Sequence, residues 1–180
     1  MYGAFGIKNY DPSALFDTSA IVKAYQELKP RLRGQSLSSI WTVWPDDKNE
    51  PCECTPIVLQ FGSYRHEICW EKFDDLMLSA NMIDVSENFN LYSLDEYPSH
   101  WRKNALPDFL PLVGQNLVNI DLLEATVNYD PDKGANQLWV PNGILFIFER
   151  DTLLVYNTLD CTNVTTDIPA GEESRYVDIW

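Results

Sequence analysis

A nine-residue phrase occurs twice in this chain, eighty positions apart. "LRGQSLSSI" occupies residues 32–40 and "LVGQNLVNI" occupies residues 112–120, and Leu, Gly, Gln, Leu and Ile stand in the same five positions of both. Glycine accepts a positive φ and lets the chain turn, and the leucine and isoleucine that follow favour a strand with apolar side chains in a core. Each phrase therefore predicts the start of a β-strand.

The residues after each phrase predict a β-hairpin. After the first phrase, strand-like runs at 56–61 and 64–71 flank Gly62-Ser63, a pair that suits a type II′ turn. After the second phrase, runs at 144–149 and 152–157 flank another two-residue turn. Because the second pair of strands is almost continuously apolar, we expect it to be covered on both faces, and the first hairpin to leave one face to solvent.

The shared order of phrase, polar loop and hairpin predicts an internal duplication. The two copies span residues 32–92 and 112–168, and residues 93–111 form the linker, with a short helix at 99–104. Pairing the copies would bury the apolar face of each in one core. The single domain, residues 1–180, is therefore predicted to be α+β and mainly β, with antiparallel meanders in a sandwich-like or half-barrel core.

A helix is predicted over residues 17–29, before the first phrase. Asp17 or Thr18 can cap it, and Pro30 and Gly34 are expected to end it. Its apolar residues fall on one stripe at helical spacing: Ile21, Val22, Tyr25 and Leu28. A final strand is expected at residues 173–180, "ESRYVDIW".

Charge restricts the partners of this chain. Lys and Arg number 13 against 27 Asp and Glu, a net charge of −14. Such a field repels phosphate backbones and anionic membranes and speeds encounter with a cationic partner. The sequence therefore predicts no nucleic-acid binding and no membrane association, and the alternative is that acidity serves solubility alone. Without an N-terminal signal segment or a long apolar run, we expect a cytoplasmic protein.

Residues for catalysis are scarce. The two histidines are His66, expected to be a half-buried strand residue, and His100, expected to be exposed, and no nucleophile motif or phosphate-binding loop accompanies them. Cys52, Cys54 and His66 could form a metal site only if the fold gathered them, because their spacing is not that of a zinc site. We therefore predict no enzyme, no cofactor and no metal.

Acidic loops interleaved with aromatic residues form the candidate binding site. Rings supply anchors that lose their hydration on binding, and carboxylates steer and pair with basic side chains. The predicted partner-binding residues are Asp46, Asp47, Glu50, Glu53, Trp70, Glu71, Asp74, Asp75, Asp84, Glu87, Asp95 and Glu96. At least half of the aromatic residues near these carboxylates are expected to be core.

In size, acidity, β-rich build and lack of catalytic motifs, the chain resembles the small immunity proteins of bacterial contact-dependent and polymorphic toxin systems. The resemblance implies a protein that neutralises a cognate toxin, often a basic nuclease, by covering its active site. The predicted function is therefore binding of a cationic toxin. One alternative is a small-ligand or carbohydrate-binding domain, possibly hydrolytic, and another is a structural subunit that pairs through the C-terminal hairpin.

Overall fold

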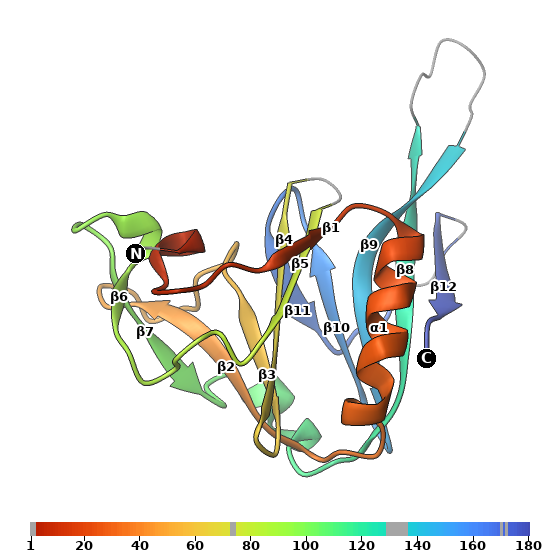
Figure 1. Cartoon of the computed structure of the whole chain (residues 1–180), viewed down its shortest axis with the longest axis horizontal. Helices are drawn as coiled ribbons and strands as arrows, with labels where there is room; N and C mark the ends of the chain where they lie inside the picture. Colours follow the sequence, from red (N-terminus) through yellow and green to blue (C-terminus); the bar gives the residue numbers. More distant parts are fainter. Residues whose placement is uncertain (1–2, 73–74, 129–136, 170, 172) are drawn as a thin grey trace.

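The computed structural model describes residues 3–72, 75–128, 137–169, 171 and 173–180. These residues form two antiparallel β-sheets packed face to face, with one α-helix (Figure 1). The predicted class, α+β and mainly β with a sandwich-like core, is confirmed.

The first sheet has seven strands in the order β1-β5-β4-β3-β2-β7-β6. Its strands are β1 (Ser13–Leu15), β2 (Leu37–Pro45), β3 (Ile57–Phe61), β4 (Tyr64–Glu71), β5 (Asp75–Ala80), β6 (Phe89–Asn90) and β7 (Pro98–Lys103). Within the described residues, three short 3-10 helices lie outside the strands: η1 (Ala4–Gly6), η2 (Leu91–Ser93) and η3 (Pro107–Leu112).

The second sheet has five strands in the order β11-β10-β9-β8-β12. They are β8 (Leu117–Asn128), β9 (Gln137–Phe148), β10 (Thr152–Asn157), β11 (Thr162–Thr165) and β12 (Ser174–Asp178). The expected C-terminal strand is thus β12, which pairs with β8. Side chains from both sheets fill the main core, including Leu59, Trp70 and Phe146.

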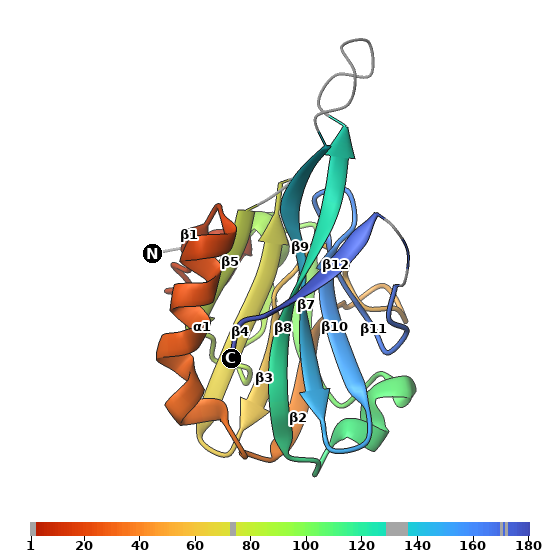
Figure 2. The ribbon, with the colours of Figure 1, turned by 90° about the vertical axis from the view of Figure 1, so that its right-hand side faces the viewer.

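Helix α1 (Thr18–Leu32) lies beside the second sheet and covers the β4 and β5 side of the first (Figure 2). The Asp17 carboxylate caps it by accepting a hydrogen bond from the Ala20 N–H at 2.8 Å. The expected end at Pro30 is wrong, because the helix continues to Leu32. Leu32 is fully buried, and its burial offsets the one backbone hydrogen bond that a proline removes.

The two copies of the phrase lie side by side and bond to each other. Gly34 N donates to Leu117 O at 3.0 Å and Gly114 N to Leu37 O at 2.8 Å, and both glycines have positive φ. The strand that begins inside each phrase carries a register shift near its start, just after Leu37 and just after Leu117. The phrases therefore join the two sheets, while the internal duplication itself remains a prediction.

Both predicted hairpins are present. The second, β9–β10, is covered on both faces as expected, since Phe146 and Val155 enter the main core and Leu145 and Leu154 enter a smaller cluster behind it. The first, β3–β4, was expected to leave one face to solvent, and this is wrong. Val58 on that face is fully buried beneath two other segments of the chain, residues 4–10 and 83–89.

The helix predicted at 99–104 is wrong, because strand β7 occupies this stretch and pairs with β2. The alternation of burial is regular: Ser99 and Trp101 are buried, whereas His100 and Arg102 are partly exposed. The sequence did not show this period of two, because Trp101 is the one large apolar residue in the stretch and the buried Ser99 is polar. Trp101 is a packing residue, as expected.

Candidate functional site

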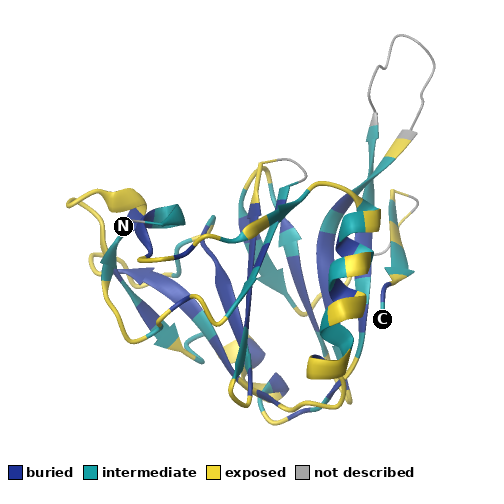
Figure 3. Cartoon of the chain, in the orientation of Figure 1, coloured by how far each residue is buried: buried dark blue, intermediate teal, exposed yellow. Residues whose placement is uncertain are grey.

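Two acidic segments gather at one end of the molecule, around β6 and β7 (Figure 1). Residues 46–53 and 84–96 contain eight carboxylates and one lysine. Their loops are largely exposed (Figure 3), and the predicted binding residues among them, all exposed, are Asp46, Asp47, Glu50, Glu53, Asp84, Glu87, Asp95 and Glu96. We call residues 46–53 and 84–97 the acidic end.

A groove of about 340 Å³ lies within the acidic end. Asp46, Asp84 and Glu87 line it together with the apolar residues Phe89 and Trp101. The groove therefore combines three carboxylates from two loops with an aromatic wall. This is the kind of surface that holds a basic side chain by both charge and stacking.

Lys8 is the basic residue in the lining of this groove. Its Nζ donates to Glu87 Oε1 at 2.9 Å, and this hydrogen bond is the main cause that raises the pKa of Lys8. The pKa of Asp84 is lowered, chiefly because its carboxylate accepts hydrogen bonds from the Ser86 side chain and backbone. The groove thus stabilises the charged form of both ions.

His100 links Asp46 to the outer face of β7. Arg102 Nε donates to His100 Nε2 at 2.9 Å, so that nitrogen accepts and His100 Nδ1 carries the proton. Nδ1 lies 2.6 Å from Asp46 Oδ1 and donates to it. Arg102 also stacks on Trp44 at 4.3 Å. This chain of contacts fixes Asp46 at the mouth of the groove and leaves His100 no free nitrogen to act as a base.

The loop at 91–97 presents exposed aromatic and apolar side chains. Tyr92, Leu94 and Tyr97 are each about half exposed, at 51%, 49% and 49%. Tyr92 has a positive φ of 55°, and its ring lies 6.1 Å from that of Phe5 in the N-terminal segment. This contact with the N-terminal segment restrains the loop, and a restrained loop loses less entropy on binding.

Close backbone packing also fixes this loop. Gly6 has φ of 81°, and a Cβ there would lie 2.2 Å from the Asn90 carbonyl oxygen, so only glycine fits. At the other end of the segment, the buried Glu67 carboxylate accepts a hydrogen bond from Ile83 N at 2.8 Å and another from the Ser79 hydroxyl. Glu67 and Gly6 thus fix the two flanks of the acidic stretch 84–90.

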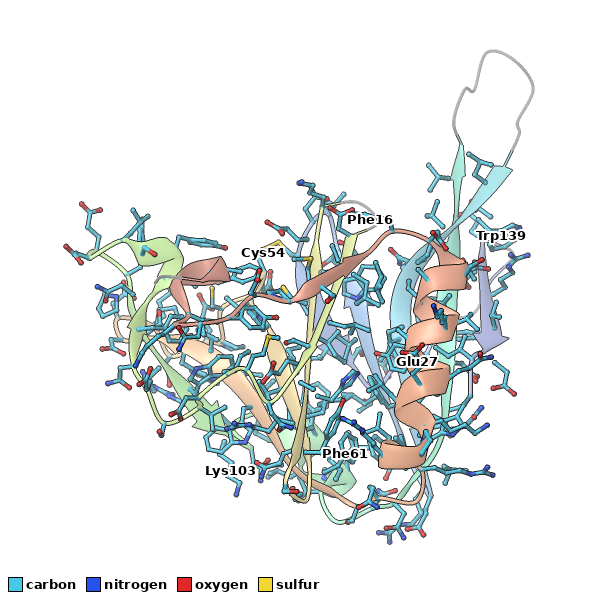
Figure 4. The ribbon with its side chains drawn as sticks, in the orientation of Figure 1. Phe16, Glu27, Cys54, Phe61, Lys103 and Trp139 are labelled. Atoms are coloured by element: carbon cyan, nitrogen blue, oxygen red, sulfur yellow. A yellow bond between two sulfur atoms is a disulfide. The ribbon has the colours of Figure 1, made fainter. Side chains whose placement is uncertain are left out.

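A disulfide between Cys54 and Cys161 fastens the other acidic loop to the second sheet. Cys54 follows the acidic residues 46–53, and Cys161 precedes β11 (Figure 4 labels Cys54). The sequence left this pairing open, because its cysteine spacing favours no bridge. The hypothetical metal site of Cys52, Cys54 and His66 does not form, since Cys54 is bonded to Cys161 and His66 packs in the main core against Tyr25 and Phe146.

Three of the predicted binding residues lie apart from the acidic end. Trp70 is 1% exposed in the main core, so its assignment as a binding residue is wrong. Glu71 and Asp75 pair in register at the β4–β5 hairpin, where Asp75 lies 3.8 Å from Lys72 Nζ. Asp74 lies outside the described residues.

Three residues of the site were missed by sequence reasoning. Lys8, Arg102 and Glu67 come from separate segments and reach the acidic end only through folding. No local apolar pattern in the sequence signals them, because Lys8–Glu87 and Arg102–Asn49 join segments that are far apart in the chain.

Comparisons with protein-family models, with curated proteins and with solved structures found no match for this chain. In the described part of the chain, no helix has the length and apolar character needed to cross a bilayer. The site itself therefore carries the functional argument.

Proposed function

We propose that this protein is a non-catalytic binding protein whose acidic end holds a cationic protein, and that the partner is a toxin domain of the kind that small immunity proteins neutralise. The observation that carries the proposal is the gathering of eight carboxylates beside three half-exposed apolar side chains on a preformed loop. Carboxylates supply long-range attraction, and the exposed rings supply contact area at low entropy cost.

The charge and shape of the acidic end support a protein partner over a nucleic acid. A phosphate backbone would be repelled by this surface, whereas lysine and arginine side chains would be attracted to it. Tyr92 and Tyr97 stand next to Asp95 and Glu96, so one partner surface can meet apolar and charged groups together. Protein interfaces commonly join an aromatic anchor to a polar rim in this way.

The first experiment is affinity purification of the tagged protein from its native cells at low and moderate salt, with mass spectrometry of what is retained. We expect one stoichiometric basic protein whose retention falls as salt rises. A retained acidic protein, or retention that does not change with salt, contradicts the proposal. A protein without any partner also contradicts it.

Binding kinetics with the purified partner then test the surface. We expect Asp95→Asn/Glu96→Gln to slow association about three- to tenfold at low salt, because steering charge is lost at the interface. The matched control is Glu27→Gln/Glu173→Gln, which makes the same charge change on exposed residues near α1 and β12. If both pairs slow association equally, net charge alone acts and the acidic end is not the interface.

A second candidate function is the binding of a small ligand, and a groove between α1 and β5 favours it. The groove has a volume of about 250 Å³ and is lined by Leu28, Leu78, Tyr64 and His66. His66 is fully buried, and its Nδ1 has no hydrogen-bond partner among the described residues. Ligand-observed NMR with a fragment library, compared between the native protein and His66→Phe, tests this candidate; loss of a saturable signal in the variant supports it, and no binding fragment rejects it.

The third alternative, pairing through the C-terminal hairpin, has no such support. Leu145 and Leu154 on the second face of β9–β10 are covered within the chain, together with Leu123. The apolar faces of this hairpin are therefore already buried in the single molecule.

A further inference from the structure

The groove of the acidic end already holds a cation from the chain itself. Lys8 Nζ bonds to Glu87, but the Lys8 side chain is 62% exposed and the Glu87 side chain 44% exposed. Ion pairs this exposed contribute little to stability because water and salt screen them. A basic side chain from outside can therefore take the place of Lys8 at little cost.

Among the described residues, each of the three carboxylates in the groove makes its hydrogen bonds through a single oxygen. Asp46 uses Oδ1 for His100, Asp84 uses Oδ1 for Ser86, and Glu87 uses Oε1 for Lys8. The second oxygen of each accepts no hydrogen bond from the described residues. A planar guanidinium carries five N–H donors and can serve several such acceptors at once, whereas an ammonium group is a compact point charge.

The aromatic wall of the groove also suits arginine. The rings of Phe89 and Trp101 lie 5.9 Å apart and line the groove beside the carboxylates. Guanidinium groups stack on aromatic faces, as Arg102 does on Trp44. The groove volume, about 340 Å³, is enough for one such side chain.

Trp101 contributes to the groove through its ring. The side chain is 7% exposed, and its Nε1 is buried without a hydrogen-bond partner in the described part of the chain. A partner's polar group therefore cannot reach this nitrogen, and the indole ring is the part of Trp101 that can form the wall of the groove.

We infer that this groove is the anchor site for one arginine of the cationic partner, whose guanidinium displaces Lys8, bonds to Asp46, Asp84 and Glu87, and packs against the wall formed by Phe89 and Trp101. The inference rests on the proposed function, and it specifies the contact by which the acidic end would hold its partner. Lys8 then acts as an internal competitor that neutralises part of the negative charge of the empty groove.

Two small probes test this directly in an NMR titration of the isotope-labelled protein. Nα-acetyl-arginine N-methylamide carries the guanidinium and two carbonyls, and Nα-acetyl-citrulline N-methylamide has the same shape without charge. We expect the arginine probe to saturate, to shift the Trp101 indole N–H signal, and to bind at least about tenfold more tightly than the citrulline probe. Equal binding of the two probes, or saturation without a shift at Trp101, overturns the inference.

Single substitutions separate the anchor site from general electrostatics. Lys8→Met should tighten binding of the arginine probe about threefold by removing the competitor, and Glu87→Gln should weaken it about threefold or more. Glu27→Gln on α1, away from the acidic end, makes the same charge change as Glu87→Gln and should leave binding unchanged (Figure 4). An unchanged affinity in Lys8→Met, or an equal loss in Glu27→Gln, rejects the site.

The same variants distinguish failure of the inference from failure of the proposed function. If a cationic protein binds in a salt-dependent manner but Lys8→Met and Glu87→Gln leave its affinity unchanged, the anchor site is wrong and the binding function stands. If the arginine probe binds in the groove but no cationic protein is retained from cells, the site stands and the proposed function is wrong.

Discussion

The imidazole of His66 lies in the main core, where the Tyr25 hydroxyl is 3.0 Å from its Nε2 and the rings of Tyr64 and Phe146 flank it. The sequence predicted a half-buried residue, but the side chain is fully buried. Burial lowers the pKa of His66 to about 3, because the charged form loses its hydration. His66 is therefore neutral at physiological pH.

This burial predicts a loss of stability in acid. The unfolded chain protonates His66 near pH 6.5, whereas the folded protein does so only near pH 3. The contribution of His66 to the free energy of unfolding is therefore fully present above pH 6.5 and is lost as pH falls from 6.5 to 3. The loss by pH 3 amounts to roughly 5 kcal/mol or less from this one residue. Urea unfolding between pH 7 and pH 4 measures it, with His66→Phe as the comparison; an equal slope in both proteins contradicts the expectation.

At the residue scale, charge was easier to predict than burial. The eight carboxylates of the acidic end are exposed as expected, because an unpaired carboxylate is costly to bury. The burial of Trp70 could not be predicted in the same way. Its ring is covered by the second sheet, where its Nε1 lies 3.4 Å from the Val155 carbonyl, and no local pattern reveals such a contact.

Among the elements, the two turns of the repeated phrase have the clearest physical cause. Gly34 has φ of 70° and Gly114 has φ of 92°, and a Cβ at either position would meet no atom within 4 Å. Glycine is therefore favoured at these two positions because of the positive φ, and not because a Cβ atom would lack room. Leu37 and Leu117, which follow these turns, are both buried in the main core.

Alanine substitutions test the two turns as a pair. We expect Gly34→Ala and Gly114→Ala each to lower the free energy of unfolding by about 1–2 kcal/mol, because alanine is strained at positive φ. Gly171→Ala is the control, since Gly171 has equal space around it without a positive φ, and it should change stability by less than about 0.5 kcal/mol. Chemical denaturation measures all three; a neutral Gly34→Ala would show that this turn does not require glycine.

The sequence predicted the hairpins and the start of α1, but not where α1 ends. Gly62 has φ of 60° in the β3–β4 turn, and its sequence pair marked that turn correctly. The end of α1 at Leu32 depends on burial of that side chain beneath the sheets, which the local signal of Pro30 cannot report. Strand β7 likewise depends on β2 and β6, its two partners in the sheet.

At the scale of the whole molecule, the disulfide joins segments that are far apart in sequence. Cys54 and Cys161 are separated by 107 residues, whereas Cys52 and Cys69 are free. Such bonds persist mainly in oxidising compartments. The expected cytoplasmic location stays a prediction, and the state of this disulfide in native cells is a test of it.

Breaking the disulfide should destabilise the fold. Because it closes a loop of this length, we expect Cys54→Ser/Cys161→Ser to lower the free energy of unfolding by about 2–4 kcal/mol, and Cys52→Ser to have little effect. Urea denaturation measures both variants. Thiol labelling of the unfolded, unreduced protein from native cells should modify only Cys52 and Cys69; labelling at all four cysteines would show that the bond does not form there.

The sequence by itself determined the β-rich class, the capped helix, the two hairpins and an acidic surface, because each depends on periodicity, turn residues or charge within a short stretch. Only the tertiary structure decided which acidic loops meet, that Lys8 reaches Glu87, and that residues 4–10 cover the outer face of β3. These outcomes depend on contacts between distant segments, and such contacts stabilise the fold only once the two sheets have packed.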